Sequence, residues 1–142
     1  MRPSRIILFV IVLAFVGIQF LDVDRSNPPV TKELQASAEV KLILKDACYD
    51  CHSNETKWPW YSKVAPISFF ISNHVTEGRE HLNFSTWGDM YTPKQNEYKK
   101  EIWEEIEKGE MPLTNYIWLH PKAKLTIEQR QVIKKWALGE KF

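Results

Sequence analysis

The stretch Cys48-Tyr49-Asp50-Cys51-His52 decides how the rest of the chain is interpreted. It has the pattern C-x-x-C-H, which is typical of the attachment site of a c-type haem. Two thiols on one helical turn can add to the two vinyl groups of one porphyrin, and the imidazole that follows directly can point at the iron. We therefore predict one haem c, covalently attached to Cys48 and Cys51, with His52 as the proximal axial ligand of the iron.

A C-x-x-C pair also occurs in thioredoxin-like redox sites, in zinc sites and in simple disulfides. A zinc site needs four ligands, usually from a second Cys/His pair, and Cys48 and Cys51 are the only two cysteines of the chain. A thioredoxin-like pair belongs to a β-α-β fold, and no such pattern is present. A dithiol or disulfide and a metal site stay open as alternatives to haem.

Length and composition limit the classes of protein that the chain can belong to. The 142 residues allow one domain and a short appendage. The net charge of +1 gives no reason to expect a nucleic-acid partner. Six tryptophans are many for this length and suit a haem pocket, although any small core also uses large aromatic side chains.

The first 21 residues resemble a signal anchor. Arg2 and Arg5 precede the run Ile6 to Leu21, in which Gln19 is the only polar residue. The run is short for a spanning helix of about 20 residues and long for a signal-peptide core of about 7–15, and no small-x-small cleavage site follows. We predict an uncleaved transmembrane segment over residues 1–21, and a buried core helix is the alternative. The positive-inside rule then predicts an inner-membrane-anchored protein with its haem domain in the periplasm.

The remaining chain divides into a linker and one helical domain. Residues 22–32 contain Ser26-Asn27-Pro28-Pro29 and predict a polar linker, so the haem-binding domain is expected over residues 33–142. Apolar periodicity predicts helices over about 37–51 and 66–78. Two more helices are expected, each with a capping box and a terminal glycine: Thr92 to Gly109 and Thr126 to Gly139. No segment alternates with period two, so we predict an all-α, small cytochrome c-like helical haem domain behind an N-terminal membrane anchor helix.

A second axial ligand is expected opposite His52. Met111 follows a helix-ending glycine and precedes Pro112, which would project its side chain from a stiff loop, so we predict Met111 as the distal axial ligand. His120 is the alternative, and it could instead bond a propionate or a carbonyl. Three further candidates have simpler interpretations as loop, core or surface residues: Met90, His74 and His81.

The aromatic loop after the C-x-x-C-H motif is the candidate wall of the haem pocket. Trp58-Pro59-Trp60-Tyr61 follows His52 closely, and Pro59 makes a helix unfavourable there. We predict that Trp58, Trp60 and Tyr61 line the pocket, and a surface loop packed on the core is the alternative.

The chain resembles the bacterial haem-binding domain family of the cytochrome c type, whose members are small and often membrane-anchored monohaem proteins. The resemblance covers nearly all of residues 41–137. Its more specific segments are Trp58-Pro59-Trp60-Tyr61 and Leu82-Asn83-Phe84-Ser85, and it also includes Gly109-Glu110-Met111-Pro112. It implies haem binding through Cys48, Cys51 and His52, with Met111 distal, and it supplies no settled reaction.

The expected function is single-electron transfer outside the cytoplasm by a membrane-tethered c-type protein with an unidentified redox protein partner. Methionine/histidine ligation raises the reduction potential and leaves no open site for a substrate, which favours a carrier over an enzyme. The alternative is a haem-based sensor or a small-ligand or peroxide-handling haem protein, whose sixth position is open or weakly held. A thiol oxidoreductase is a third class, and it would purify without haem.

Overall fold

The computed structural model describes residues 3–140, and these residues form helices joined by loops, without a β-strand. The all-α prediction is therefore confirmed for this part of the chain. The α-helices are α1 (Pro3–Ile18), α2 (Ala38–Ala47), α3 (Tyr49–His52), α4 (Ile67–His81), α5 (Thr92–Lys108), α6 (Thr114–Leu119) and α7 (Ile127–Leu138). Three 3₁₀ helices join them: η1 (Trp60–Lys63), η2 (Phe84–Asp89) and η3 (Pro121–Ala123).

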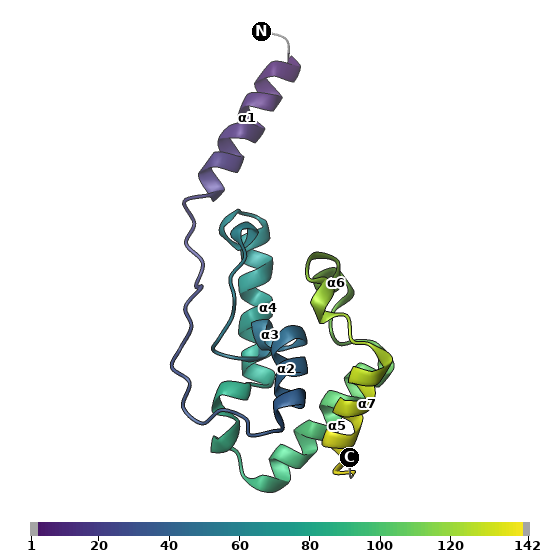
Figure 1. The fold of residues 1–142 in the computed structure, drawn as a ribbon. Helices are drawn as coiled ribbons and strands as arrows, with labels where there is room; N and C mark the ends of the chain where they lie inside the picture. Colours follow the sequence, from purple (N-terminus) through teal and green to yellow (C-terminus); the bar gives the residue numbers. More distant parts are fainter. Residues whose placement is uncertain (1–2, 141–142) are drawn as a thin grey trace.

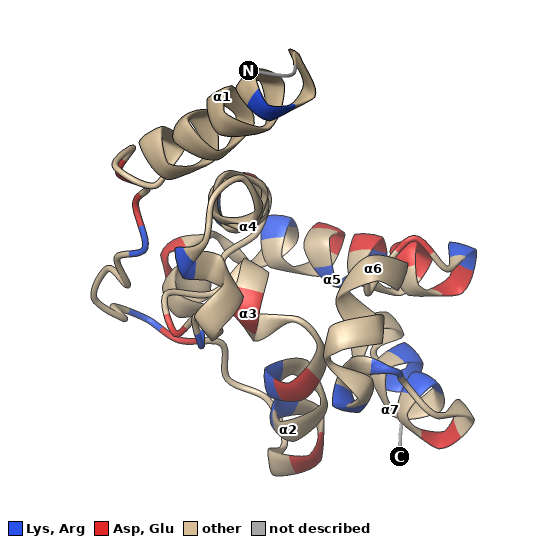
Figure 2. Cartoon of the chain, turned by 90° about the horizontal axis from the view of Figure 1, so that it is seen from above, with Lys and Arg blue, Asp and Glu red and all other residues tan. Residues whose placement is uncertain are grey.

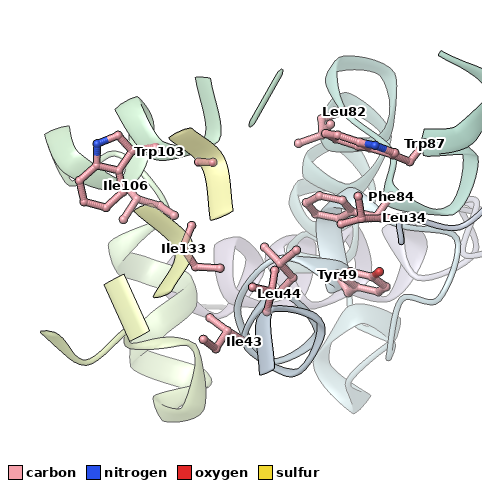
Figure 3. Close-up of a cluster of buried hydrophobic side chains, with 12 residues drawn as sticks. Leu34, Ile43, Leu44, Tyr49, Leu82, Phe84, Trp87, Trp103, Ile106 and Ile133 are labelled. Atoms are coloured by element: carbon pink, nitrogen blue, oxygen red, sulfur yellow. The ribbon is translucent and has the colours of Figure 1, made fainter. Parts of the chain in front are cut away.

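Two groups of helices face each other across the domain. Helices α2, α3 and α4 form one side, and α5, α6 and α7 form the other, while α1 stands apart at the end of an extended segment (Figure 1). Apolar side chains from both groups meet in one core, in which Leu44 and Ile133 are almost completely buried (Figure 3). The core thus fixes the distance between the two sides.

The helix expected over residues 37–51 is divided at Cys48. Ser37 caps its start, where the side chain accepts a hydrogen bond from the Val40 N–H at 3.4 Å. The backbone of Cys48 (φ −127°, ψ −34°) leaves helical geometry, so α2 ends at Ala47 and α3 begins at Tyr49 in a new direction. This break lets α3 pack on α4 while α2 packs on α7.

Of the expected helix ends, those at the two terminal glycines are confirmed, whereas α4 continues past Gly78 to His81. Gly109 and Gly139 have left-handed φ values of 80° and 70° and end α5 and α7. The capping box at Thr126 is present. The one expected at Thr92 is wrong, because Tyr91 is the N-cap. The Gln95 side chain instead donates hydrogen bonds to the carbonyls that end η2, at 2.8 and 3.2 Å.

Helix α1 contains 16 residues, and none of them is buried. Over the described residues no helix is both long and apolar enough to cross a membrane. The structure therefore gives no support to the predicted transmembrane anchor over residues 1–21, of which Met1 and Arg2 lie outside the described part.

The segment expected to be a linker lies against the domain. Its backbone carbonyls accept hydrogen bonds from domain side chains: Asp24 from the Ser72 hydroxyl at 2.8 Å, and Pro29 from the amide of Asn54 at 2.9 Å. Leu34, just beyond it, is 1% exposed and belongs to the core. Residues 22–32 are therefore a fixed strap along the domain.

Candidate cofactor site

A cavity of about 550 Å³ lies between the two groups of helices. This volume is within the range of roughly 300–1,000 Å³ that small-molecule and cofactor pockets occupy. Both cysteines, His52 and Met111 line it. Its apolar walls come from both sides of the domain: Ala47, Leu82, Phe84, Ile102, Ile106, Pro112 and Leu113.

The C-x-x-C-H segment forms one turn at the edge of this cavity. The N–H groups of Cys51 and His52 both donate to the Cys48 carbonyl, at 3.2 and 2.9 Å. Both thiols are free. Burial raises the pKa of Cys48 to about 12 and that of Cys51 to about 11. A thioredoxin-like pair works through a lowered thiol pKa, so this environment does not favour the thiol oxidoreductase alternative.

The imidazole of His52 is fixed by two backbone carbonyls. Its Nδ1 lies 2.9 Å from the Gly78 oxygen and 3.2 Å from the Leu82 oxygen. Because a carbonyl can only accept, Nδ1 carries the proton and Nε2 keeps a free lone pair. Burial also lowers the pKa of His52, which favours the neutral ring. A carbonyl on one nitrogen and a free lone pair on the other is the usual arrangement of a metal-binding histidine.

Gly78 makes this arrangement possible. A Cβ atom at this position would lie 2.6 Å from the carbonyl oxygen of Cys51, so only glycine lets α4 approach α3 this closely. The ring of Phe84 meets His52 edge-on, with 6.5 Å between the centroids, and Tyr49 stacks on Phe84 at 5.1 Å. His52 is therefore held by hydrogen bonds on one edge and by aromatic packing behind it.

Met111 reaches the same cavity from the other side. After Gly109 the chain folds back, and the N–H groups of Glu110 and Met111 both donate to the Glu105 carbonyl, at 3.0 and 3.2 Å. Met111 remains 37% exposed. Met90, by contrast, packs on the hydrophobic core and is not part of the cavity wall. The structure thus brings the predicted distal ligand and the predicted proximal ligand to one cavity.

His120 lines a second cavity of about 320 Å³ and not the first. Its Nε2 lies 3.2 Å from the Tyr61 hydroxyl, and its Nδ1 lies 3.1 Å from the Tyr116 carbonyl oxygen. The ring also stacks on Tyr116, with 4.1 Å between the centroids. Both nitrogens of His120 are therefore engaged away from Cys48 and Met111.

The three aromatic residues predicted to form the pocket lie apart from the first cavity. Tyr61 lines the second cavity, which shares Cys51 and other residues with the first. Trp60 is 77% exposed and meets the Tyr61 ring edge-on. Trp58 has a buried Nε1 with no acceptor among the described residues, and neither tryptophan lines either cavity.

Sequence reasoning missed the hydrogen bonds around the motif, of which the one from Tyr116 joins the two sides. The Tyr116 hydroxyl donates to Asp50 Oδ2 at 2.7 Å, and the Lys57 N–H donates to Asp50 Oδ1 at 3.0 Å. Arg79 donates from Nε to the Ser53 carbonyl at 2.8 Å, directly after the motif. Asp50, the polar residue between the two cysteines, was the one sequence signal for the contact with Tyr116.

The ionisable side chains on the cavity wall include glutamates and histidines. Glu77, Glu101 and Glu105 lie there together with His74 and His81, and no lysine or arginine of the described chain lines this cavity. His81 Nε2 lies 3.0 Å from Glu101 Oε1. Any anionic group in the cavity would therefore find no lysine or arginine among the described wall residues.

A family model described as a haem-binding domain matches residues 13–138 of this chain. No curated protein and no solved structure matches the chain. The residues fit such a cofactor: an apolar cavity contains an oriented imidazole with a free lone pair and two free thiols on one turn.

Proposed function

Because the chain belongs to the haem-binding domain family, we propose that its cavity holds one haem c, attached through Cys48 and Cys51, with His52 as the proximal ligand. The orientation of His52 by the Gly78 and Leu82 carbonyls is the observation that carries this proposal. It provides an imidazole whose Nε2 needs no rearrangement to bind iron. Orienting contacts of this kind typically contribute 10–100-fold to metal affinity.

We further propose that Met111 is the distal ligand and that the protein transfers single electrons. When bound, the haem supplies a one-electron ferric/ferrous couple. A thioether is a soft ligand that favours the ferrous form, and it occupies the position that a small ligand would need. The place of Met111 on the wall of the cavity supports this assignment. His120 is the weaker candidate, since it would have to leave both of its hydrogen-bonding partners.

A second function is favoured by one feature of the distal side. Met111 is more than one-third exposed and lies on a loop, so its bond to iron can be weak. In that case the protein would bind small ligands or sense them. We also keep three predictions from the sequence: a location outside the cytoplasm, attachment to a membrane and an unidentified redox partner. The C-x-x-C-H motif supports the location, because it is matured outside the cytoplasm in bacteria. Arg5 before an apolar run supports the membrane attachment.

Optical spectra test the proposal. The full chain is produced in a host with cytochrome c maturation and measured oxidised, reduced, and reduced with carbon monoxide. We expect low-spin spectra, a near-infrared sulfur-to-iron band in the ferric form, and no reaction with carbon monoxide. A haem-free product would contradict haem binding, and ready carbon monoxide binding would replace electron transfer by the ligand-binding function. Met90→Ala is the matched control and should change none of these spectra.

A further inference from the structure

Large apolar side chains gather at the end of the domain where α4 begins and α6 lies. Ile67 and Phe70 of α4 and Leu119 of α6 line the second cavity together, so the two helices face each other there. All three are exposed, at 48%, 69% and 64%. Trp60 and Trp118 are 77% and 79% exposed, and each is next in sequence to a residue that lines this cavity, Tyr61 and Leu119. We refer to these five exposed residues as the apolar end face.

The apolar end face adjoins the base of α1. The side chain of Gln19, just after α1, donates to the Ala65 carbonyl and accepts from the Ala65 N–H, both at 3.0 Å. Ala65 lies two residues before Ile67, at the start of α4. Figure 1 shows α1 extending away from this end of the domain. The apolar surface of α1 and the apolar end face are therefore neighbours at one end of the molecule.

Charge distinguishes this end from the rest of the domain. Residues 57–76 contain two lysines, Lys57 and Lys63, and no acidic residue, and residues 111–121 contain no Asp, Glu, Lys or Arg. In Figure 2, α6 is tan along its whole length, whereas α5 carries several acidic residues. Exposed tryptophans beside lysines are typical of surfaces at the membrane–water interface, where indole rings lie at headgroup level and lysines meet anionic lipid.

The length of α1 gives a reason for the domain to approach a bilayer. Its 16 residues rise about 24 Å at 1.5 Å per residue, which is less than the roughly 30 Å of a hydrocarbon core. Phe20 and Leu21 follow it and are 83% and 59% exposed. If the apolar surface of α1 is in lipid, a short helix keeps the residues after it close to the interface. The domain end, which is hydrogen-bonded to Gln19, then lies close to the interface as well.

We propose that the apolar end face is a membrane-contact surface that lies on a lipid bilayer beside α1. Trp60 and Trp118 enter the headgroup region, and Lys57 and Lys63 meet lipid phosphates. The Gln19–Ala65 pair and the strap of residues 22–32 hold the domain in one orientation, with the apolar end face toward the lipid. The proposal does not depend on haem and does not require α1 to cross the bilayer.

Photolabelling by lipid tests this surface. The full chain is reconstituted into vesicles of equal parts phosphatidylcholine and phosphatidylglycerol, with a trace of a phospholipid that carries a diazirine near its headgroup. Labelled peptides are mapped by mass spectrometry. We expect label on residues 58–70 and 113–119 as well as on residues 3–21. Label confined to residues 3–21, or absent, would overturn the proposal.

A double variant and a matched control make the test specific. Phe70→Glu with Trp118→Glu should remove label from both domain segments, leave it on residues 3–21 and leave the haem spectrum unchanged. Ile127→Glu changes a residue that is 76% exposed on α7, and it should leave the pattern intact. Unchanged domain labelling in the double variant would contradict the proposal. The proposal would also be contradicted if residues 58–70 of two chains crosslinked to each other and the lipid label on them disappeared. A second copy of the chain would then cover this surface.

Discussion

The two sides of the cavity are built differently. On the His52 side, the imidazole contacts two carbonyls and an aromatic ring, and helix α4 approaches α3 so closely that no Cβ fits at Gly78. On the Met111 side, a loop carries a side chain that is 37% exposed. The comparison indicates that the fold prepares the proximal ligand and leaves the distal one adjustable. Variants on the first side should therefore affect folding and haem retention, and variants on the second should affect what the iron binds.

Gly78→Ala should give the largest loss of stability. The new Cβ would lie 2.6 Å from a backbone oxygen, so α4 must move and the carbonyl on His52 must move with it. Overpacking of this kind costs about 1–3 kcal/mol. Urea unfolding and haem content of the purified protein measure the effect. Gly17→Ala is the control, because nothing lies within 4 Å of its Cβ position. Equal stability of the two variants would show that the His52 side is not tightly packed.

Met111→Ala should change the spectrum far more than the stability. The side chain is partly exposed, so we expect a loss of less than about 1 kcal/mol. The sulfur-to-iron band should disappear, the reduction potential should fall, and the ferrous protein should bind carbon monoxide. His120→Ala provides the comparison. If it abolishes the band while Met111→Ala does not, the distal ligand is His120.

The sequence identified residues that the structure brings to one cavity, and it left their local geometry open. The C-x-x-C-H motif and the Gly109 to Pro112 loop predicted His52 and Met111 as the two axial ligands, and both residues line one cavity. The break at Cys48 could not be predicted, because the apolar periodicity of α2 continues through it. The six residues of α6 are too few to show a helical period. Contacts from backbone carbonyls, as at Gly78 and Leu82, leave no side-chain signal in a sequence.

The sequence also did not show in which direction side chains and loops point. Trp58-Pro59-Trp60 predicted a rigid loop near His52, but rigidity does not say which way the rings point, and Trp60 points to solvent. The strap of residues 22–32 has the composition of a linker, and it is held by domain side chains that lie far away in the sequence. Only tertiary contacts determine whether a loop side chain is exposed or a linker-like segment is fixed to the domain.

Tyr116→Phe tests whether the two sides are coupled. The hydroxyl of Tyr116, on α6, donates to Asp50 Oδ2 inside the motif at 2.7 Å and so links the two sides. We expect a loss of about 1 kcal/mol in the free energy of unfolding. Because α6 follows the Met111 loop, we also expect the ferrous variant to bind carbon monoxide, which the unaltered protein should not do. Tyr91→Phe changes a tyrosine that is 70% exposed and should do neither. If Tyr116→Phe also fails to react with carbon monoxide, the two sides move independently.

A small pH effect should come from the His52 side. Burial acts to raise the pKa of Glu33, but the hydrogen bond and the charge of Lys41 outweigh it and hold the pKa below its ordinary value of 4.5. The stabilisation by Glu33 is therefore complete above pH 4.5 and is lost as the pH falls through the lowered pKa. Glu33→Gln should flatten this part of the curve of unfolding free energy against pH. If the curves of the variant and the unaltered protein have the same shape, other groups cause the loss of stability in acid.

Intact-mass measurement after solvent extraction tests the central claim most directly. The full chain, matured in a host that attaches c-type haem, is denatured, extracted with acidified organic solvent and weighed beside Cys48→Ala and Cys51→Ala. We predict that the wild-type chain keeps the added mass of one haem through the extraction. The single variants should hold haem by one thioether and give lower yields. A wild-type chain that loses its haem to the solvent and returns to the mass of the polypeptide would contradict covalent attachment.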